Sequence, residues 1–137
     1  RVICEYLDSL HAGARFFPAS GPARWTALRL QALADGIMEA ALLARYETFL
    51  RPEPNRWSAW IDGQLDKVVR GLERLEEVEL ANLGNRIDIG AIGVACALGY
   101  IDFRFPGLAW RDTRPGLAAW YEAFASRPSM QATVPPS

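Results

Sequence analysis

The stretch that most constrains the fold is 85–102, with the sequence NRIDIGAIGVACALGYID. No charged residue occurs between Asp88 and Asp102, and a helix that is apolar on every side is a buried helix. The run is too short to cross a bilayer, which requires about 20 apolar residues. Glycines in a helix interior cost roughly 1 kcal/mol each relative to alanine. We therefore expect neighbouring helices to approach this one closely at its three glycines, Gly90, Gly93 and Gly99.

The start of this helix carries a capping signal. Asn85 can accept a hydrogen bond from the backbone N–H of Asp88, and the Asp88 carboxylate can reach back to the N–H of Asn85. This pattern is a capping box with Asn and Asp in place of Ser or Thr and Glu. An acid or base role for Asp88 is the alternative, but the spacing favours a structural cap worth about 1 kcal/mol.

The length and net charge of the chain limit the number of domains and the kinds of partner that can be expected. The 137 residues suffice for one domain with a hydrophobic core. The net charge of −1 gives no indication of a nucleic-acid partner or of an anionic membrane. The sequence shows no signal peptide and no transmembrane run. Because it starts without Met and inside a helical pattern, we expect it to be part of a longer protein.

The chain has two cysteines and one histidine that could bind a transition metal through sulfur or imidazole nitrogen. Cys4 lies in a short amphipathic stretch and Cys96 in the buried helix, so we expect two reduced, core-type thiols in a cytoplasmic protein. His11 has no second His or clustered Cys beside it, which indicates a surface or linker residue and no metal site. The sequence also has no phosphate-binding loop, no dinucleotide-binding glycine pattern and no nucleophile elbow.

The remaining periodicity predicts an all-α fold of five helices. Apolar residues at helical spacing mark a short helix from Val2 to Leu10, and Pro18, Gly21 and Pro22 then indicate a linker. Two long helices are expected at about 23–50 and 56–78, followed by a connection at 76–84 and the buried helix. We expect an irregular aromatic segment at 102–112, and a last helix that begins near residue 114 and ends at Pro128.

The order of these segments resembles the end of a glutathione transferase. The segment VICEYLD resembles the last helix of the family's thioredoxin-like half, and NRID is similar to the capping box that opens the family's central helix. The closing segment FPGLAWRDTRPGLAAWYEAFASRPSM also matches, and LADGIMEAALLARYE followed by RPE is similar to a bacterial branch. The resemblance implies a thioredoxin-like remnant at 1–12, a linker at 13–22 and an all-helical C-terminal domain at 23–137.

The resemblance implies one half of an enzyme that conjugates or reduces small electrophiles with glutathione, normally as a homodimer. In the family, the thioredoxin-like half carries the residue that activates the thiol, a cis-proline and an acidic-Ser pair. None of these is in the chain, so we assign no catalytic residue and no metal, and expect the chain alone to be inactive. The alternative is a non-enzymatic interaction module of the same fold, as found attached to translation or assembly factors. The segment RVICEYLD favours the enzyme.

The resemblance also indicates which residues would contact the electrophile. Met38 falls at the position that faces the glutathione thiol, with Leu42 and Arg45 one and two turns further on and Ala34 one turn before. Met and Leu would form an adaptable apolar pocket, and Arg45 could hold an anionic substrate or a glutathione carboxylate. A core stripe is the alternative for these positions. Phe103 and Phe105 could close the far side of the pocket, but ordinary packing is favoured for both.

Overall fold

The computed structural model describes residues 1–136, and every regular element in that range is helical, as predicted. The longer helices are α1 (Val2–Ser9), α2 (Gly21–Phe49), α3 (Ser58–Arg74), α5 (Ile89–Arg104) and α7 (Pro115–Ala125). Short helical turns join them: η1 (Glu53–Asn55), η2 (Leu75–Glu79), α4 (Leu80–Leu83), η3 (Pro106–Leu108), α6 (Trp110–Thr113) and α8 (Pro128–Gln131).

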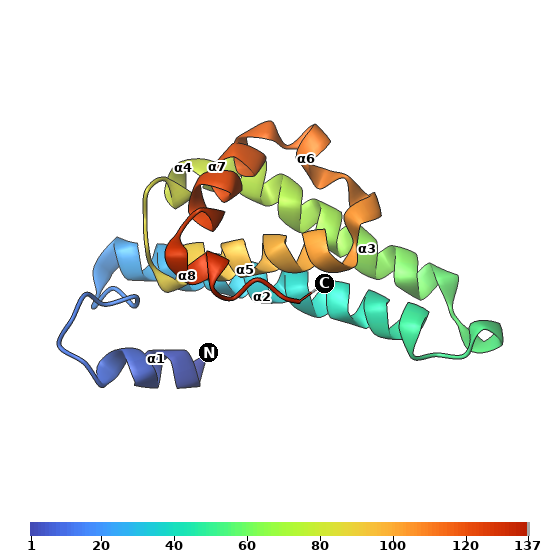
Figure 1. Cartoon of the computed structure of the whole chain (residues 1–137), viewed down its shortest axis with the longest axis horizontal. Helices are drawn as coiled ribbons and strands as arrows, with labels where there is room; N and C mark the ends of the chain where they lie inside the picture. The colour runs from blue at the N-terminus through green and yellow to red at the C-terminus, as the bar shows by residue number, and fades with distance from the viewer. Residues whose placement is uncertain (137) are drawn as a thin grey trace.

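The hydrophobic core lies between α2, α3 and α5. Figure 1 shows α2 and α3 as two long antiparallel helices, with α5 lying along α2. α7 packs against α5, and α8 follows beside α7. α5 is the buried helix expected from its composition, since Val94, Leu98 and Ile101 have no exposed surface. Gly90 permits its close approach to α2, because a methyl group there would lie 2.6 Å from the Ala27 carbonyl oxygen.

The cap of α5 differs from the predicted capping box. Asp88 is the N-cap, and its Oδ1 accepts a hydrogen bond from the backbone N–H of Ala91 at 3.0 Å. Asn85 is exposed, lies outside the helix, and its side chain forms no hydrogen bond with residues 1–136. The box is incomplete because Ala91, at the third helical position, has no side chain that could reach back. The second carboxylate oxygen of Asp88 accepts instead from Arg86 Nε at 2.7 Å.

Three segment boundaries also differ from those predicted. The expected connection at 76–84 continues the helix as a π turn and α4. The expected irregular segment contains the last turn of α5, η3 and α6. α7 ends at Ala125, and Pro128 begins α8 instead of ending the last helix, since proline suits a first helical position.

α1 stands apart from the bundle (Figure 1). The buried Asp8 carboxylate joins it to the linker by accepting from the backbone N–H groups of Phe16 and Phe17, at 2.9 and 3.1 Å. The apolar face of α1 is uncovered, with exposed fractions between 56% and 80% for five side chains: Val2, Ile3, Tyr6, Leu7 and Leu10.

No single helix within residues 1–136 has both the length and the apolar character needed to cross a bilayer. The helical segments Ile89–Arg104 and Pro106–Thr113 meet those criteria only as a pair, which is bent by 100°.

Candidate functional site

A cavity of about 550 Å³ lies beside the C-terminal half of α5. Its walls come from α2, α5, α7, α8 and the segment that follows α8. The lining is mostly apolar and contains no Lys or Arg side chain. The residues that line it are Met38, Ala95, Cys96, Gly99, Tyr100, Asp102, Phe103, Tyr121, Ala125, Met130, Gln131, Thr133, Val134 and Pro135.

Cys96 brings a thiol to this cavity. The sequence predicted a core thiol, but its side chain is exposed on the side of α5 that faces the cavity. The surrounding atoms partly desolvate the sulfur, and this raises the pKa of the Cys96 thiol. Because the thiolate is the reactive form, Cys96 is a weak nucleophile at neutral pH and acts as part of an apolar wall.

Tyr121 brings a phenol to the same cavity. Its ring packs edge-on against Trp110, with the ring centroids 6.2 Å apart, and the Arg111 guanidinium lies 5.1 Å from its ring centroid. Burial raises the pKa of Tyr121, the Asp102 charge adds to that increase, and the Arg111 charge opposes it. The hydroxyl is therefore neutral at physiological pH.

Asp102 lines the cavity, but its carboxylate oxygens already have partners. Oδ1 accepts from the Trp110 indole N–H at 2.8 Å, and Oδ2 pairs with Arg111 at 2.5 Å. These contacts hold Trp110 and Arg111, the two side chains that lie against the Tyr121 ring. In the sequence Tyr121 shares the apolar face of the last helix with Leu117 and Phe124, and its hydroxyl was the one signal of a polar contact there.

The structure places one of the four predicted α2 residues in this cavity. Met38 is half-buried in its wall. Ala34 has no exposed surface and packs in the core near Gly93 of α5. Leu42 is 38% exposed, and the Arg45 guanidinium lies 4.2 Å from the centroid of the Phe49 ring. Neither of these two lines the cavity.

The two phenylalanines for which the sequence favoured ordinary packing over a place in the pocket are divided between the cavity and the core. Phe103 lines the cavity. Phe105 is partly buried and packs against the hydrophobic core. The cavity thus brings together Met38 and Phe103, which are far apart in the sequence.

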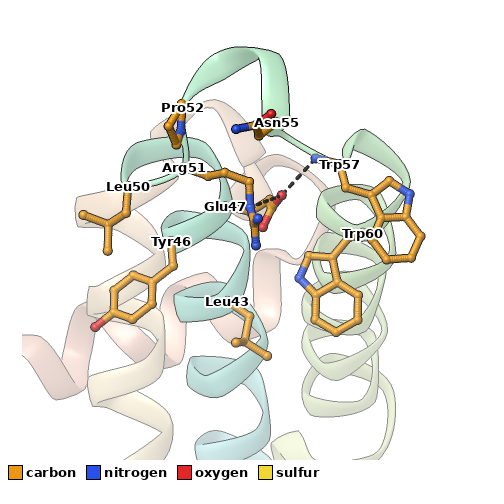
Figure 2. Close-up of a pocket in the computed structure, with 9 residues that line it drawn as sticks. All are labelled: Leu43, Tyr46, Glu47, Leu50, Arg51, Pro52, Asn55, Trp57 and Trp60. Carbon is orange, nitrogen blue, oxygen red and sulfur yellow. Dashed lines mark hydrogen bonds and ion pairs between the residues drawn. The ribbon is translucent and has the colours of Figure 1, made fainter.

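A second cleft, of about 840 Å³, lies where α2 meets α3 (Figure 2). Trp57 and Trp60 form one wall, with their rings stacked at 6.0 Å between centroids. The buried Glu47 carboxylate accepts from the Trp57 backbone N–H at 2.9 Å and pairs with Arg51 at 2.8 Å. The Trp57 hydrogen bond is the main cause of the lowered pKa of Glu47.

The Glu47–Arg51 pair explains why the second cleft is not the candidate reactive site. The carboxylate is ionised and its oxygens hold the turn between α2 and α3, while the other side chains around it are aromatic, aliphatic or amide groups. Within residues 1–136 no three His, Cys, Asp or Glu side chains are grouped as ligands for a metal ion.

The comparison with protein families gives a match over residues 40–123 to the model for the glutathione S-transferase C-terminal domain. The chain belongs to the glutathione S-transferase family. It is 31% identical, over 98% of its own length and 67% of the relative's, to the uncharacterized GST-like protein YibF of Escherichia coli strain K12. This membership confirms the resemblance and the all-α fold of the C-terminal type.

Two solved glutathione transferase structures are similar to the chain. One, from Pseudomonas fluorescens Pf-5 and holding S-(propanoic acid)-glutathione, has a TM-score of 0.97 and 54% identity, covering 100% of this chain and 70% of that one. The other, from Methylobacillus flagellatus KT with glutathione bound, has a TM-score of 0.90 and 37% identity, covering 98% and 67%. The shared fold places the Met38 cavity on a glutathione transferase scaffold.

Proposed function

We propose that this chain supplies the electrophile-binding wall of a glutathione transferase that conjugates or reduces small electrophiles. The observation that carries the proposal is the cavity beside Met38, the residue that the family resemblance places opposite the glutathione thiol. Its apolar lining without a cationic side chain suits an uncharged electrophile. Two similar proteins hold glutathione or a glutathione conjugate, which supports glutathione as the co-substrate.

In this proposal α1 is the last helix of a thioredoxin-like domain. The five apolar side chains of α1 are exposed here, and an adjoining domain would cover them. That domain would supply the thiol-activating residue and lower the pKa of the glutathione sulfur, so that a thiolate attacks the electrophile. Leu42 and Arg45 would lie outside the Met38 cavity, at the edge that faces this domain.

A homodimer and a cytoplasmic location are part of the same proposal. The aromatic cleft of Figure 2 supports the dimer, because exposed Tyr46, Trp57 and Leu50 leave an apolar surface near the α2–α3 turn. The two free thiols, Cys4 and Cys96, support a reducing compartment.

The test uses a protein that joins this chain to the thioredoxin-like domain of its parent. We expect retention on glutathione resin, elution by free glutathione, and glutathione-dependent consumption of an electrophile such as benzyl chloride or an organic hydroperoxide. The 137-residue chain alone is the control and should do neither. A folded full-length protein with no retention and no turnover would contradict the proposal and favour a non-enzymatic interaction module.

A further inference from the structure

We propose that Glu76 is a positioning residue for the electrophile cavity, because its carboxylate holds the first turn of α7, the helix that supplies one wall. Glu76 is half-buried and does not line the cavity itself. The inference rests on the proposed function and adds to it a residue that acts on substrate binding through a helix. Three observations support it: the hydrogen bonds of Glu76, the lack of an equivalent support for α7, and the tight packing of α7 on α5 at the cavity.

The Glu76 carboxylate lies at the start of α7. Its Oε1 accepts from the backbone N–H of Gly116 at 3.1 Å, and its Oε2 accepts from the N–H of Leu117 at 2.6 Å. These are the first backbone donors of α7, since Pro115 has no N–H. Such donors have no partner within their own helix, and a carboxylate also suits the positive end of the helix dipole. Glu76 therefore caps α7 from a separate part of the chain.

The sequence at the start of α7 provides no cap of its own. Arg114, the N-cap residue, makes no side-chain cap hydrogen bond. Gly116 is what lets the distant carboxylate reach the helix, because a methyl group at that position would lie 3.0 Å from Glu76 Oε1 and 2.5 Å from Leu80 Cδ2. The absence of a side chain at residue 116 thus belongs to the same device as the carboxylate at residue 76.

Arg114 and Trp120 also connect this part of the chain with α3 and with the end of α4. Arg114 Nη2 lies 3.4 Å from each of its acceptors on α3, beyond the usual range of about 2.7–3.2 Å for an N–H···O bond. Trp120 Nε1 donates to the Gly84 carbonyl at 3.0 Å, but this bond is exposed and lies further along α7. The two bonds to Glu76 are therefore the main polar support of the first turn.

The position of α7 determines how much space the cavity offers. Tyr121 and Ala125 line it, one and two turns beyond Leu117. The packing on α5 is tight, because a methyl group added at Gly99 would lie 2.9 Å from the Tyr121 hydroxyl oxygen. A small movement of α7 relative to α5 would change the contacts that the wall makes with a substrate. Loss of the Glu76 carboxylate should therefore weaken electrophile binding at a distance.

The experiment compares the full-length protein with its Glu76→Ala variant and with Glu77→Ala as the matched control. Glu77 is the next residue of the same turn, is exposed, and makes no hydrogen bond or ion pair with residues 1–136. Glu76→Ala should raise KM for benzyl chloride about fivefold, while kcat and KM for glutathione stay within about twofold. A merely structural role would reduce the amount of folded enzyme, which lowers the apparent kcat and leaves KM unchanged.

Glu76→Gln is a milder variant that keeps the length of the side chain and one acceptor oxygen. Its KM for benzyl chloride should lie between those of the wild type and Glu76→Ala. Thermal unfolding shows that each variant is folded under the assay conditions. If Glu76→Ala does not fold, the comparison of Glu76→Gln with Glu77→Ala decides the question, with the same direction of change expected.

A second measurement needs no turnover. Cys96 lines the cavity, so its rate of labelling by N-ethylmaleimide reports access to that space. Peptide mass spectrometry distinguishes it from Cys4, which lies on α1 and serves as the internal reference. A loosened α7 should make the labelling of Cys96 severalfold faster in Glu76→Ala, whereas the labelling of Cys4 should not change.

An unchanged KM for benzyl chloride or an unchanged labelling rate of Cys96 in folded Glu76→Ala would overturn the inference. Equal increases of KM for both substrates, or the same changes in Glu77→Ala, would overturn it as well. A folded wild-type protein without glutathione-dependent activity would contradict the proposed function. The labelling rates would then decide by themselves whether Glu76 positions the wall of the cavity.

Discussion

Four buried carboxylates hold the turns and helix ends of this molecule in place. Asp8 binds backbone N–H groups of the linker, Glu47 binds the start of α3, and Asp88 caps α5. Glu79 has no exposed surface and accepts hydrogen bonds from Arg29, Arg74 and Asn82. Each carboxylate satisfies donors that would otherwise be unpaired, which is costly in a protein interior. Individual acidic residues therefore fix the segment boundaries.

Asp88→Ala should lower thermal stability without changing glutathione affinity in full-length protein that remains folded. The substitution removes the bond to the Ala91 N–H and leaves Arg86 without its carboxylate. Loss of an N-cap costs about 1 kcal/mol, and the unpaired partner adds to that. Thermal denaturation and glutathione titration measure the two effects. Asn85→Ala is the matched control and should leave the melting temperature unchanged; an equal loss in the control would contradict the cap assignment.

Glu79→Gln should destabilise the protein at pH 7 and make its stability less dependent on acid. Burial opposes ionisation of Glu79, but hydrogen bonds from Arg29, Asn82 and Arg74, together with the Arg29 charge, outweigh it, and the pKa of Glu79 lies below its usual value. A lowered pKa in the folded state gives stability that is present above the unfolded-state pKa, about 4.3, and is lost as the pH falls through the folded-state pKa.

Denaturant titrations at pH 7 and pH 3 measure this effect. The difference between wild type and Glu79→Gln should be smaller at pH 3 than at pH 7. A difference of the same size at both pH values would show that the variant acts through packing and not through charge. Asp66→Asn, which changes an exposed carboxylate paired only with Arg70 on α3, is the matched control and should have little effect at either pH.

At the level of elements, the pairing of α2 with α5 depends on close backbone approach. Gly90 lies against Ala27 and Leu30 of α2. Gly36 of α2 is exposed and has no atom within 4 Å of an added methyl group. A glycine is therefore needed for close helix packing at residue 90 but not at residue 36, and the sequence alone does not distinguish the two positions.

Gly90→Ala and Gly36→Ala should change stability in opposite directions. The methyl group at residue 90 would collide with the Ala27 backbone, and forced overpacking typically costs about 1–3 kcal/mol. At residue 36 the methyl group meets nothing and improves helix propensity, a gain of up to about 1 kcal/mol. Denaturant unfolding of both variants checks this. A tolerated Gly90→Ala would mean that α5 does not approach α2 as described.

The elements that could be predicted from sequence are those with a strong local pattern. The two long helices follow from the spacing of their apolar residues, and the buried helix follows from its uncharged run of apolar and small residues. The helical turn at 79–83 was not predicted; Glu79, at its start, binds Arg29, which is far away in the sequence. The cap register of α5 was misplaced since Asn and Asp both suit an N-cap, and only packing decides between them.

The cavity was only partly predictable for a similar reason. Met38 came from the family resemblance, and the apolar periodicity of α2 alone would have placed it in the core. Tyr121 and Cys96 lie on different helices, and nothing local indicates that they share a cavity. The segment after α8 completes the wall through Thr133 and Val134, and its sequence carries no periodic signal.

At the scale of the whole molecule, two uncovered apolar surfaces lie at separate places. One is the face of α1 and the other is the aromatic cleft near the α2–α3 turn (Figures 1 and 2). If one adjoining domain covers the α1 face, the aromatic cleft remains available for contact with another copy of the protein. The proposed dimer and the proposed thioredoxin-like domain thus use different parts of the chain.

Tyr46→Lys in the full-length protein should weaken the dimer. Tyr46 is 51% exposed and lines the cleft, so a charge there is tolerated in a monomer but is costly when desolvated in an interface. Light scattering after size exclusion should show a shift towards the monomer mass at micromolar concentration. Val78→Lys, at a 48% exposed apolar position outside the cleft, is the control. Unchanged mass in Tyr46→Lys would place any dimer contact elsewhere.

The central claim is that the cavity beside Met38 receives the electrophile. The most direct measurement is the KM of full-length Met38→Trp for benzyl chloride and for glutathione, compared with Glu39→Trp, which adds the same ring at an exposed neighbouring position. We predict that Met38→Trp, by filling the cavity, raises KM for benzyl chloride at least tenfold and leaves KM for glutathione within about twofold, whereas Glu39→Trp changes neither. An unchanged KM for benzyl chloride in Met38→Trp, or equal changes in the two variants, would contradict the claim.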